Sequence, residues 1–217
     1  LARQAVEECS VQRKVDVVGS VGPYGVTLFD GSEYNGHYVD KISEKIMVEY
    51  HVQQTVPLLK AGLNLIAYET VPSRKEALAI LKAADSISYS YKFWISFSCQ
   101  DGKRTNHNES FAETVRTISH HPKIYGIGIN CTSPDYVTPL LQCSRTFANA
   151  LPFIVYPNSG EAYKTDEKRW KATECIFPSL EQLTEWKSLG VKVIGGCCRV
   201  TPEVIGKISA IVAKLNS

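Results

Sequence analysis

The sequence predicts an α/β protein built on a parallel β-sheet, and three observations support this fold class. Six short apolar runs recur along the 217 residues, and segments with helix caps or helical periodicity separate them. The runs are continuously apolar rather than alternating, which is typical of parallel strands covered on both faces. Together these patterns give about six strands that alternate with seven helices.

The strands are expected where the apolar runs end in glycine or polar residues. In chain order, they are expected at residues 15–18, 63–68, 93–97, 124–129, 153–156 and 191–194. The loop 19–25 follows the first strand, and Glu69 closes the second. Asn130 with Cys131 closes the fourth, and two glycines follow the last.

Caps and apolar periodicity place the helices. Ser43, Ser73 and Ser133 stand where N-caps are expected, Glu76 completes a capping-box pattern with Ser73, and Pro57 is expected to kink or shorten its helix. The helices are expected at about residues 1–14, 43–61, 73–87, 111–118, 133–141, 180–189 and 201–215.

Two architectures fit this alternation, a doubly wound sheet and a (β/α)8 barrel. The chain starts at Leu1 within an expected helix, so we expect the first one or two strands to be missing from this sequence. Two further strands would bring six to the eight of a barrel. Residues 1–217 show no linker, low-complexity segment or repeat, and are expected to form a single barrel domain whose N-terminal part is absent.

Composition narrows the class of protein. The hydrophobic content is 44%, the charged content 21% and the net charge +2, with no run of Lys or Arg. We therefore expect no nucleic-acid partner, no membrane span and a cytoplasmic monomer or small homo-oligomer. The seven cysteines are odd in number and irregularly spaced, which favours reduced thiols acting as metal ligands or catalytic groups over a disulfide framework.

Polar groups and thiols gather at the expected carboxyl ends of the strands, where parallel α/β folds bind ligands. These positions are Ser20, Glu69, Ser98, Cys99, Asn130, Cys131, Asn158, Cys197 and Cys198. Cys131, Cys197 and Cys198 come from two strand ends, and three thiolates can bind zinc while leaving a fourth position open. Two alternatives stay open: inert buried cysteines, and a redox-active Cys197-Cys198 pair.

Other residues at the same end are candidates for substrate binding. Glu69 can hold an ammonium group, or be an exposed loop carboxylate. Asn130 and Asn158 can donate to a substrate carboxylate, or satisfy turn backbone, and Ser20 is a further candidate. Aromatic rings able to face a cation, or simply to pack in the core, are those of Tyr24, Tyr68, Tyr156 and Tyr163.

Six motifs resemble those of homocysteine S-methyltransferases, a family of zinc-dependent thiol methyltransferases. They occur in the family's order over nearly the whole chain: Gly19-Ser-Val-Gly-Pro-Tyr-Gly25, Asp30-Gly-Ser-Glu-Tyr34, Glu69-Thr-Val-Pro72, Gly128-Ile-Asn-Cys131, Tyr156-Pro-Asn-Ser-Gly-Glu161 and Gly195-Gly-Cys-Cys-Arg199. The family's N-terminal Asp-Gly-Gly strand, whose acidic residue helps to bind homocysteine, has no counterpart in this sequence.

The resemblance implies a (β/α)8 barrel with Zn²⁺ held by Cys131, Cys197 and Cys198, and a homocysteine thiolate as the fourth ligand. It implies that Glu69 binds the substrate amino group. The reaction implied is methyl transfer from a sulfonium donor, S-methylmethionine or S-adenosylmethionine, to homocysteine, forming methionine. A related acceptor such as selenocysteine fits the same class. The alternative is a non-enzymatic zinc or thiol protein, or a degenerate family member acting as a redox sensor.

Overall fold

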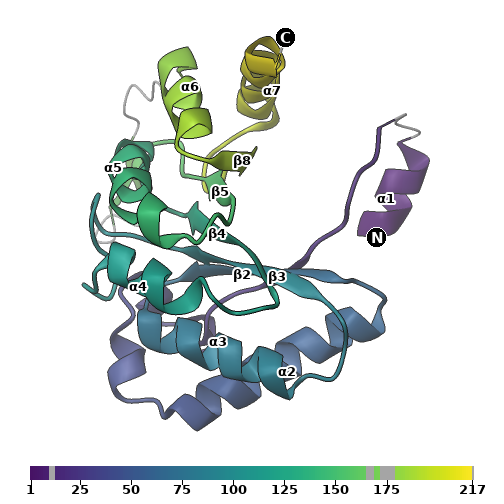
Figure 1. The fold of residues 1–217 in the computed structure, drawn as a ribbon, viewed down its shortest axis with the longest axis vertical. Helices are drawn as coiled ribbons and strands as arrows, with labels where there is room; N and C mark the ends of the chain where they lie inside the picture. The colour runs from purple at the N-terminus through teal and green to yellow at the C-terminus, as the bar shows by residue number, and fades with distance from the viewer. Residues whose placement is uncertain (10–12, 165–168, 172–178, 217) are drawn as a thin grey trace.

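A parallel sheet of six strands forms the centre of the computed structural model, which describes residues 1–9, 13–164, 169–171 and 179–216. The strands are β1 (Gly19–Val21), β2 (Leu65–Val71), β3 (Lys92–Phe97), β4 (Ile124–Asn130), β5 (Phe153–Tyr156) and β8 (Val191–Ile194). Their order in the sheet is β1-β2-β3-β4-β5-β8, and every neighbouring pair is parallel (Figure 1).

This strand order distinguishes the two predicted architectures. Along the chain, each new strand of this sheet is added beside the previous one, always on the same side. The order of the strands therefore never reverses. A doubly wound sheet instead reverses its strand order at a switch point. The arrangement is therefore that of a (β/α)8-type barrel, as predicted, and β1 and β8 are the edges of the described sheet.

Seven helices are present in the described chain. They are α1 (Ala2–Glu8), α2 (Glu44–Lys60), α3 (Arg74–Ser86), α4 (Phe111–Ile118), α5 (Pro134–Ser144), α6 (Leu180–Ser188) and α7 (Pro202–Asn216). Ser43, Ser73 and Ser133 each accept a backbone N–H at a helix start, which confirms the predicted N-caps. Helix α2 continues through Pro57 to Lys60, so the predicted shortening is wrong.

Short elements not predicted from the sequence lie between these. Three 3₁₀ helices follow β1, namely η1 (Tyr24–Leu28), η2 (Ser32–Tyr34) and η3 (His37–Asp40), and η4 (Arg145–Phe147) follows α5. The strands β6 (Ala162–Lys164) and β7 (Arg169–Lys171) pair in antiparallel fashion. Residues 22–40, which contain η1 to η3, are called the β1 loop below.

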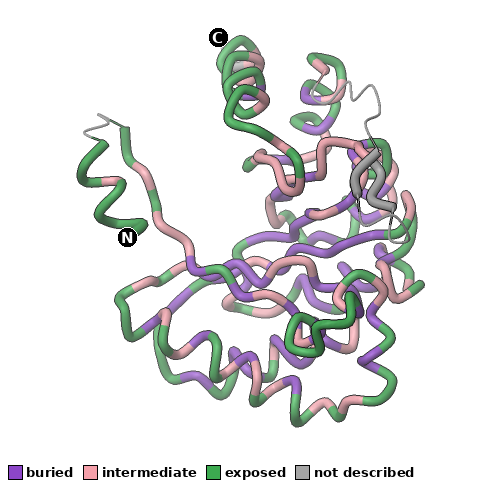
Figure 2. The backbone as a smooth tube through the Cα atoms, turned by 180° about the vertical axis from the view of Figure 1, so that it is seen from behind, coloured by how far each residue is buried: buried purple, intermediate pink, exposed green. Residues whose placement is uncertain are grey.

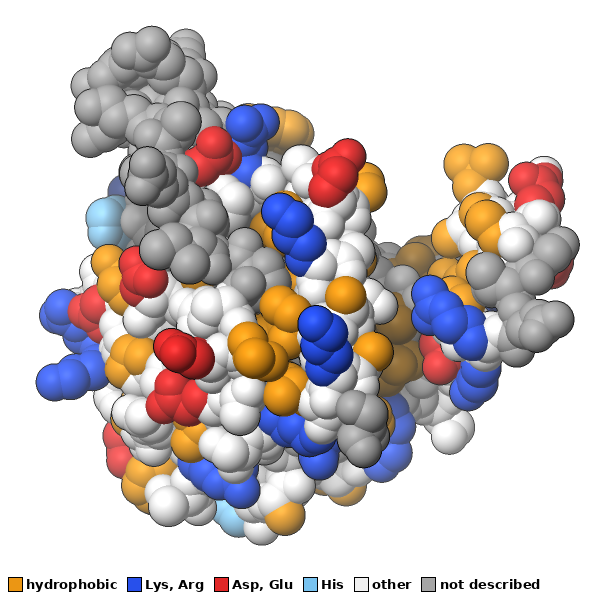
Figure 3. All heavy atoms as spheres, turned by 90° about the horizontal axis from the view of Figure 1, so that it is seen from above, with side chains coloured by type: hydrophobic (Ala, Val, Ile, Leu, Met, Phe, Trp, Pro, Cys, Tyr) orange, Lys and Arg blue, Asp and Glu red, His pale blue; other side chains and the backbone are white. Residues whose placement is uncertain are grey.

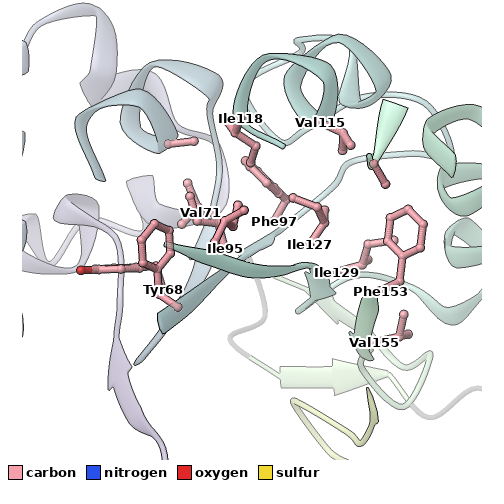
Figure 4. Packing of buried hydrophobic residues seen from close by; sticks show 14 of the residues in the cluster. Tyr68, Val71, Ile95, Phe97, Val115, Ile118, Ile127, Ile129, Phe153 and Val155 are labelled. Atoms are coloured by element: carbon pink, nitrogen blue, oxygen red, sulfur yellow. The ribbon is translucent and has the colours of Figure 1, made fainter. Parts of the chain in front are cut away.

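The hydrophobic core lies between the sheet and its helices. Alternate residues of each strand point to opposite faces, so Phe93, Ile95 and Phe97 pack toward the helices while Trp94 and Ser96 face the other way. Figure 4 shows helix-facing side chains of β2 to β5 in one cluster with Val115 and Ile118 of α4. These side chains are almost fully buried. The opposite face of the sheet, which carries Ala67, Trp94 and Ile154, borders the cavity described below.

The N-terminal region departs from the prediction. Residues 14–18 form no regular structure, and β1 begins only at Gly19, which pairs with Ile66. Residues 15–17 would lie opposite residues 62–64, which form the turn after α2, so no neighbouring strand is available to them. Helix α1 ends at Glu8 instead of residue 14, and residues 10–12 lie outside the described chain.

Helix α1 has no buried residue and stands away from the sheet (Figures 1 and 2). Its link to the body includes a hydrogen bond from Arg3 Nη1 to the carbonyl oxygen of Ala61, 2.7 Å long. Of the described helices, none combines the length and the apolar character that a membrane crossing requires. Figure 3 shows Lys and Arg side chains mixed with acidic and hydrophobic ones on the face it presents.

Candidate metal centre

Three thiols meet at the carboxyl end of the sheet. Cys131 directly follows β4, and Cys197 and Cys198 follow β8 after Gly195 and Gly196. Their Sγ atoms all lie within 4.8 Å of one another, and those of Cys131 and Cys198 are 3.6 Å apart. Thiolates bound to a tetrahedral zinc at about 2.3 Å lie about 3.8 Å apart. The three sulfurs therefore have the chemistry and nearly the spacing of a zinc ligand set.

The loop after β5 holds the cysteine-bearing loop after β8 in place. The N–H of Cys197 donates to the carbonyl of Pro157 at 2.8 Å, and the N–H of Ser159 donates to the carbonyl of Cys198 at 3.0 Å. Arg199 Nε donates to Glu161 Oε2 at 2.7 Å. The two backbone hydrogen bonds hold Cys197 and Cys198 against the loop after β5. The position of their thiols is therefore fixed by this contact between the loops.

The three thiols are coupled electrostatically. The pKa of Cys197 is lowered to about 6, chiefly because the Cys131 thiol donates a hydrogen bond to it, with further support from the Cys198 N–H and the Asn130 amide. The pKa of Cys131 is raised by its hydrogen bond to Cys197 and by burial, and that of Cys198 is raised by burial and by the charge on Cys197. One thiolate thus suppresses the others, and a bound cation would relieve this repulsion.

The inner face of the sheet forms a cavity of about 310 Å³ that reaches Gly195 and Gly196, the residues before the cysteine pair. It is lined by Val18, Ser20, Ala67, Glu69, Trp94, Ile154, Tyr156 and residues 193–196. Ser20 Oγ donates a hydrogen bond to Glu69 Oε1. Trp94 Nε1 donates to the hydroxyl of Tyr156 at 3.2 Å, and that hydroxyl donates to Ser96 Oγ at 2.6 Å. A carboxylate and an ordered tyrosine therefore face a space of small-molecule size.

The four predicted substrate-binding residues divide into two groups. Glu69 and Ser20 line the cavity. Asn158 and Asn130 instead contact the cysteine loops: Asn158 Oδ1 accepts the N–H of Cys198 at 3.2 Å, and Asn130 Nδ2 lies 3.9 Å from Cys197 Sγ. Both predicted groups lie at the same end of the sheet, but the two amides are turned toward the thiols.

The four tyrosines considered as cation-facing rings occupy different places. Tyr156 lines the cavity, whereas Tyr68 is fully buried on the helix-facing side, where its hydroxyl lies 2.8 Å from Thr55 Oγ1. Tyr24 packs against Tyr38 and Tyr50. The side chain of Tyr163 lies outside what the structure describes.

Tyr34 of the β1 loop is influenced by the thiols, a proximity that the sequence did not predict. Its pKa is raised to about 12, first by partial burial and then by electrostatic repulsion from the three-cysteine cluster. Its hydroxyl therefore lies within electrostatic reach of the thiols, although the residue is 55% exposed. The signal available was its place in the Asp30–Tyr34 motif.

The two glycines before the cysteines have different steric surroundings, which gives a testable contrast. A Cβ on Gly196 would overlap the side chain of Val200, whereas one on Gly195 would lie 3.5 Å from Tyr156 Cβ, an ordinary contact. Gly196→Ala is expected to destabilise the fold by about 1–3 kcal/mol and to weaken zinc binding, because the cysteine loop must shift. The free energy of unfolding of Gly195→Ala is expected to lie within about 1 kcal/mol of the wild-type value. Urea denaturation of both variants measures the difference, and equal stabilities would contradict the steric argument.

Fold and site together define a class: a (β/α)8-type protein with a three-cysteine centre, able to bind a metal, at the carboxyl end of its sheet. A profile described as homocysteine S-methyltransferase matches residues 1–212. The chain belongs to the homocysteine S-methyltransferase family.

Individual relatives agree with this assignment. Homocysteine S-methyltransferase 1 of Arabidopsis thaliana is 37% identical over 197 residues, covering 89% of this chain and 60% of the relative. Homocysteine S-methyltransferase YbgG of Bacillus subtilis is 37% identical, with coverages of 95% and 64%. A betaine-homocysteine S-methyltransferase of Drosophila melanogaster is also 37% identical, with coverages of 92% and 62%. The chain thus spans about three fifths of the length of these curated relatives.

Among solved structures, the homocysteine methyltransferase MmuM from Escherichia coli in its metallated form is similar. Its TM-score is 0.80 at 32% identity, and the match covers 96% of this chain and 66% of that one. Its oxidised form is similar to nearly the same degree, with a TM-score of 0.79. The strand order described above is therefore shared with a member of the same family.

Proposed function

We propose that this protein transfers a methyl group from a sulfonium donor, S-methylmethionine or S-adenosylmethionine, to homocysteine, forming methionine. The observation that carries the proposal is the convergence of the Cys131, Cys197 and Cys198 sulfurs within 4.8 Å of one another. Membership of the homocysteine S-methyltransferase family supports it, and so does the metallated form in which the similar E. coli enzyme is known.

Cys131, Cys197 and Cys198 would hold Zn²⁺ as three thiolate ligands. When bound, the metal lowers the pKa of a substrate thiol, so that the thiolate is present near neutral pH. The coupled pKa values of the three cysteines fit this role, because all three can ionise together only beside a cation.

The protein's own residues bind and orient the two substrates. Glu69 is the carboxylate that would receive the homocysteine ammonium group, and the hydrogen bond from Ser20 fixes one of its oxygens. The cavity lined by Glu69, Ser20 and Tyr156 has the volume to enclose the amino-acid part of the substrate. Tyr34 presents a ring near the thiols, where a sulfonium cation would approach.

The reaction is a single displacement. The substrate sulfur forms a bond to the methyl carbon, while the bond from that carbon to the sulfonium sulfur breaks and its electron pair stays on the departing thioether. Holding both partners in line is the main contribution available to the protein, since no acid or base is needed once the thiol is ionised.

Metal content and a donor panel test the proposal. The purified chain is expected to contain about one zinc and to form methionine from homocysteine with at least one sulfonium donor. A chelator should remove both zinc and activity, and added zinc should restore them. Betaine is included because one relative carries that donor in its name. Full methyl-transfer activity in purified protein that contains no metal would overturn the proposal.

The alternative is a zinc or thiol protein without methyl transfer, such as a redox sensor. One observation fits it: the Cys131 and Cys198 sulfurs lie 3.6 Å apart, close enough for an oxidant to join them in a disulfide. The same panel separates the two functions. Zinc-loaded protein that forms no methionine from any of the three donors would favour the alternative.

A further inference from the structure

The side chain of Asn130 is committed to bonds inside the protein. The residue is 1% exposed. Its Oδ1 accepts the backbone N–H of Thr70 at 2.8 Å, and its Nδ2 donates to Thr70 Oγ1 at 2.9 Å. The same Nδ2 lies 3.9 Å from Cys197 Sγ, as a donor toward that sulfur. The amide thus uses its oxygen and both of its donor directions on two residues of the site.

Thr70 needs such partners because of its backbone. Its φ angle is +62°, a left-handed conformation that β-branched residues rarely adopt. Asn130 satisfies both the N–H and the hydroxyl of Thr70, so it holds this conformation from two atoms at once. Glu69 immediately precedes Thr70, so the peptide that Asn130 fixes is the one that aims the Glu69 side chain into the cavity.

Asn130 therefore connects two parts of the site that lie on different strands. Its Oδ1 and Nδ2 both hold Thr70 near the end of β2, next to the carboxylate of Glu69, and the same Nδ2 reaches Cys197, the first cysteine after β8. Second-layer hydrogen bonds of this kind orient metal ligands and tune their affinity. The buried amide has no exposed donor left for a substrate carboxylate.

We propose that Asn130 is a positioning residue that sets Glu69 and Cys197 relative to each other, rather than a residue that contacts substrate. The proposal rests on the proposed function for the roles of Glu69 and Cys197. On this proposal, the buried amide of Asn130 sets the distance between the carboxylate of Glu69 and the thiol centre.

Zinc affinity, measured without substrate, tests the cysteine end. Competition with a chromophoric chelator is expected to show zinc bound about 10–100-fold more weakly by Asn130→Ala than by wild type. The exposed Asn64 just before β2, at the opposite end of the same strand, gives a matched control, and Asn64→Ala is expected to bind zinc as wild type does. A direct substrate contact would leave the zinc affinity of Asn130→Ala unchanged, and that result would overturn the proposal.

Thr70 variants test the carboxylate end with a milder change. Thr70→Ala is expected to raise the KM for homocysteine several-fold with little change in kcat, whereas Thr70→Ser keeps the hydroxyl and is expected to restore the KM. In the double variant with Asn130→Ala the two effects on KM should not add, because both remove the same bond. Fully additive effects, or a Thr70→Ala variant with the wild-type KM, would contradict the coupling.

The two proposals fail in different ways. Wild-type protein that binds zinc but transfers no methyl group would overturn the proposed function, and the zinc-affinity comparison would still decide the role of Asn130. Equal zinc affinities in an active enzyme would overturn the role of Asn130 alone. Thermal unfolding of each variant shows whether a lost affinity reflects a lost fold.

Discussion

Cys197→Ser is expected to lose stoichiometric zinc and to slow methyl transfer by more than about 100-fold. The metal ligand is a thiolate, and the serine alcohol that replaces it stays protonated at neutral pH. Cys197 is the thiol of the three whose pKa is lowered, because Cys131, the N–H of Cys198 and the Asn130 amide all donate to its sulfur. Replacing Cys197 therefore removes the thiolate that accepts the hydrogen bond from Cys131. Metal analysis together with initial rates at saturating substrates measures both losses.

Cys143→Ser provides the matched control for this substitution. Cys143 is a half-buried free thiol on α5, and its Sγ donates to the carbonyl of Leu140 at 3.3 Å, a bond that a serine hydroxyl can make as well. Zinc content and rate are expected to match wild type. If Cys197→Ser kept its zinc and its rate, the assignment of the thiol centre would be refuted.

The location of the thiol centre could be predicted from sequence because it depends on topology alone. Two strands were predicted with their observed boundaries, β5 at Phe153–Tyr156 and β8 at Val191–Ile194. Once a run is read as a parallel strand, the residues that follow it must lie at the carboxyl edge of the sheet. This reasoning places Cys131 and the Cys197-Cys198 pair at one edge of the sheet, and the resemblance to the family's motifs singled them out from the other residues there as one ligand set.

What sequence could not supply is where each side chain points. Asn130 and Glu69 both lie near the carboxyl ends of strands, yet the amide is buried between Thr70 and Cys197 while the carboxylate faces the cavity. The left-handed backbone of Thr70, whose N–H and hydroxyl are bonded to Asn130, is a feature that no pattern of residue types reveals for a β-branched residue. The start of β1 was missed because an apolar run is a strand only where a neighbouring strand can pair with it.

Glu76 shows the same limit at a helix cap. Its N–H donates to Ser73 Oγ at 3.1 Å, as the capping-box pattern predicts. Its carboxylate, however, is fully buried and receives the N–H of Tyr24 at 2.6 Å and the hydroxyl of Tyr38, with His51 Nε2 3.0 Å away. The carboxylate thus ties both halves of the β1 loop, which carries Tyr34, to α2 and α3.

Glu76→Ala is accordingly expected to destabilise the protein by about 3–5 kcal/mol, because the buried Tyr38 and His51 and the half-buried N–H of Tyr24 lose their common partner at once. For a chain of this size, that corresponds to a fall in melting temperature on the order of 10 °C. The released β1 loop should also cost activity at temperatures where the rest of the fold survives, since Tyr34 would no longer be held beside the thiols. Calorimetry and rates measured well below the melting temperature separate the two effects.

Glu113→Ala is the matched control, because Glu113 holds the same third position of a helix after an N-cap serine. Its N–H donates to Ser110 Oγ at 3.3 Å, but its carboxylate pairs with Arg116 on the surface. Exposed pairs of this kind contribute little, so its melting temperature should lie close to that of wild type. Glu76→Gln keeps the shape and one acceptor and should fall between the two alanine variants. Equal melting temperatures for Glu76→Ala and Glu113→Ala would show that the buried carboxylate does not hold the β1 loop, because the loss of its three partners would then have cost nothing.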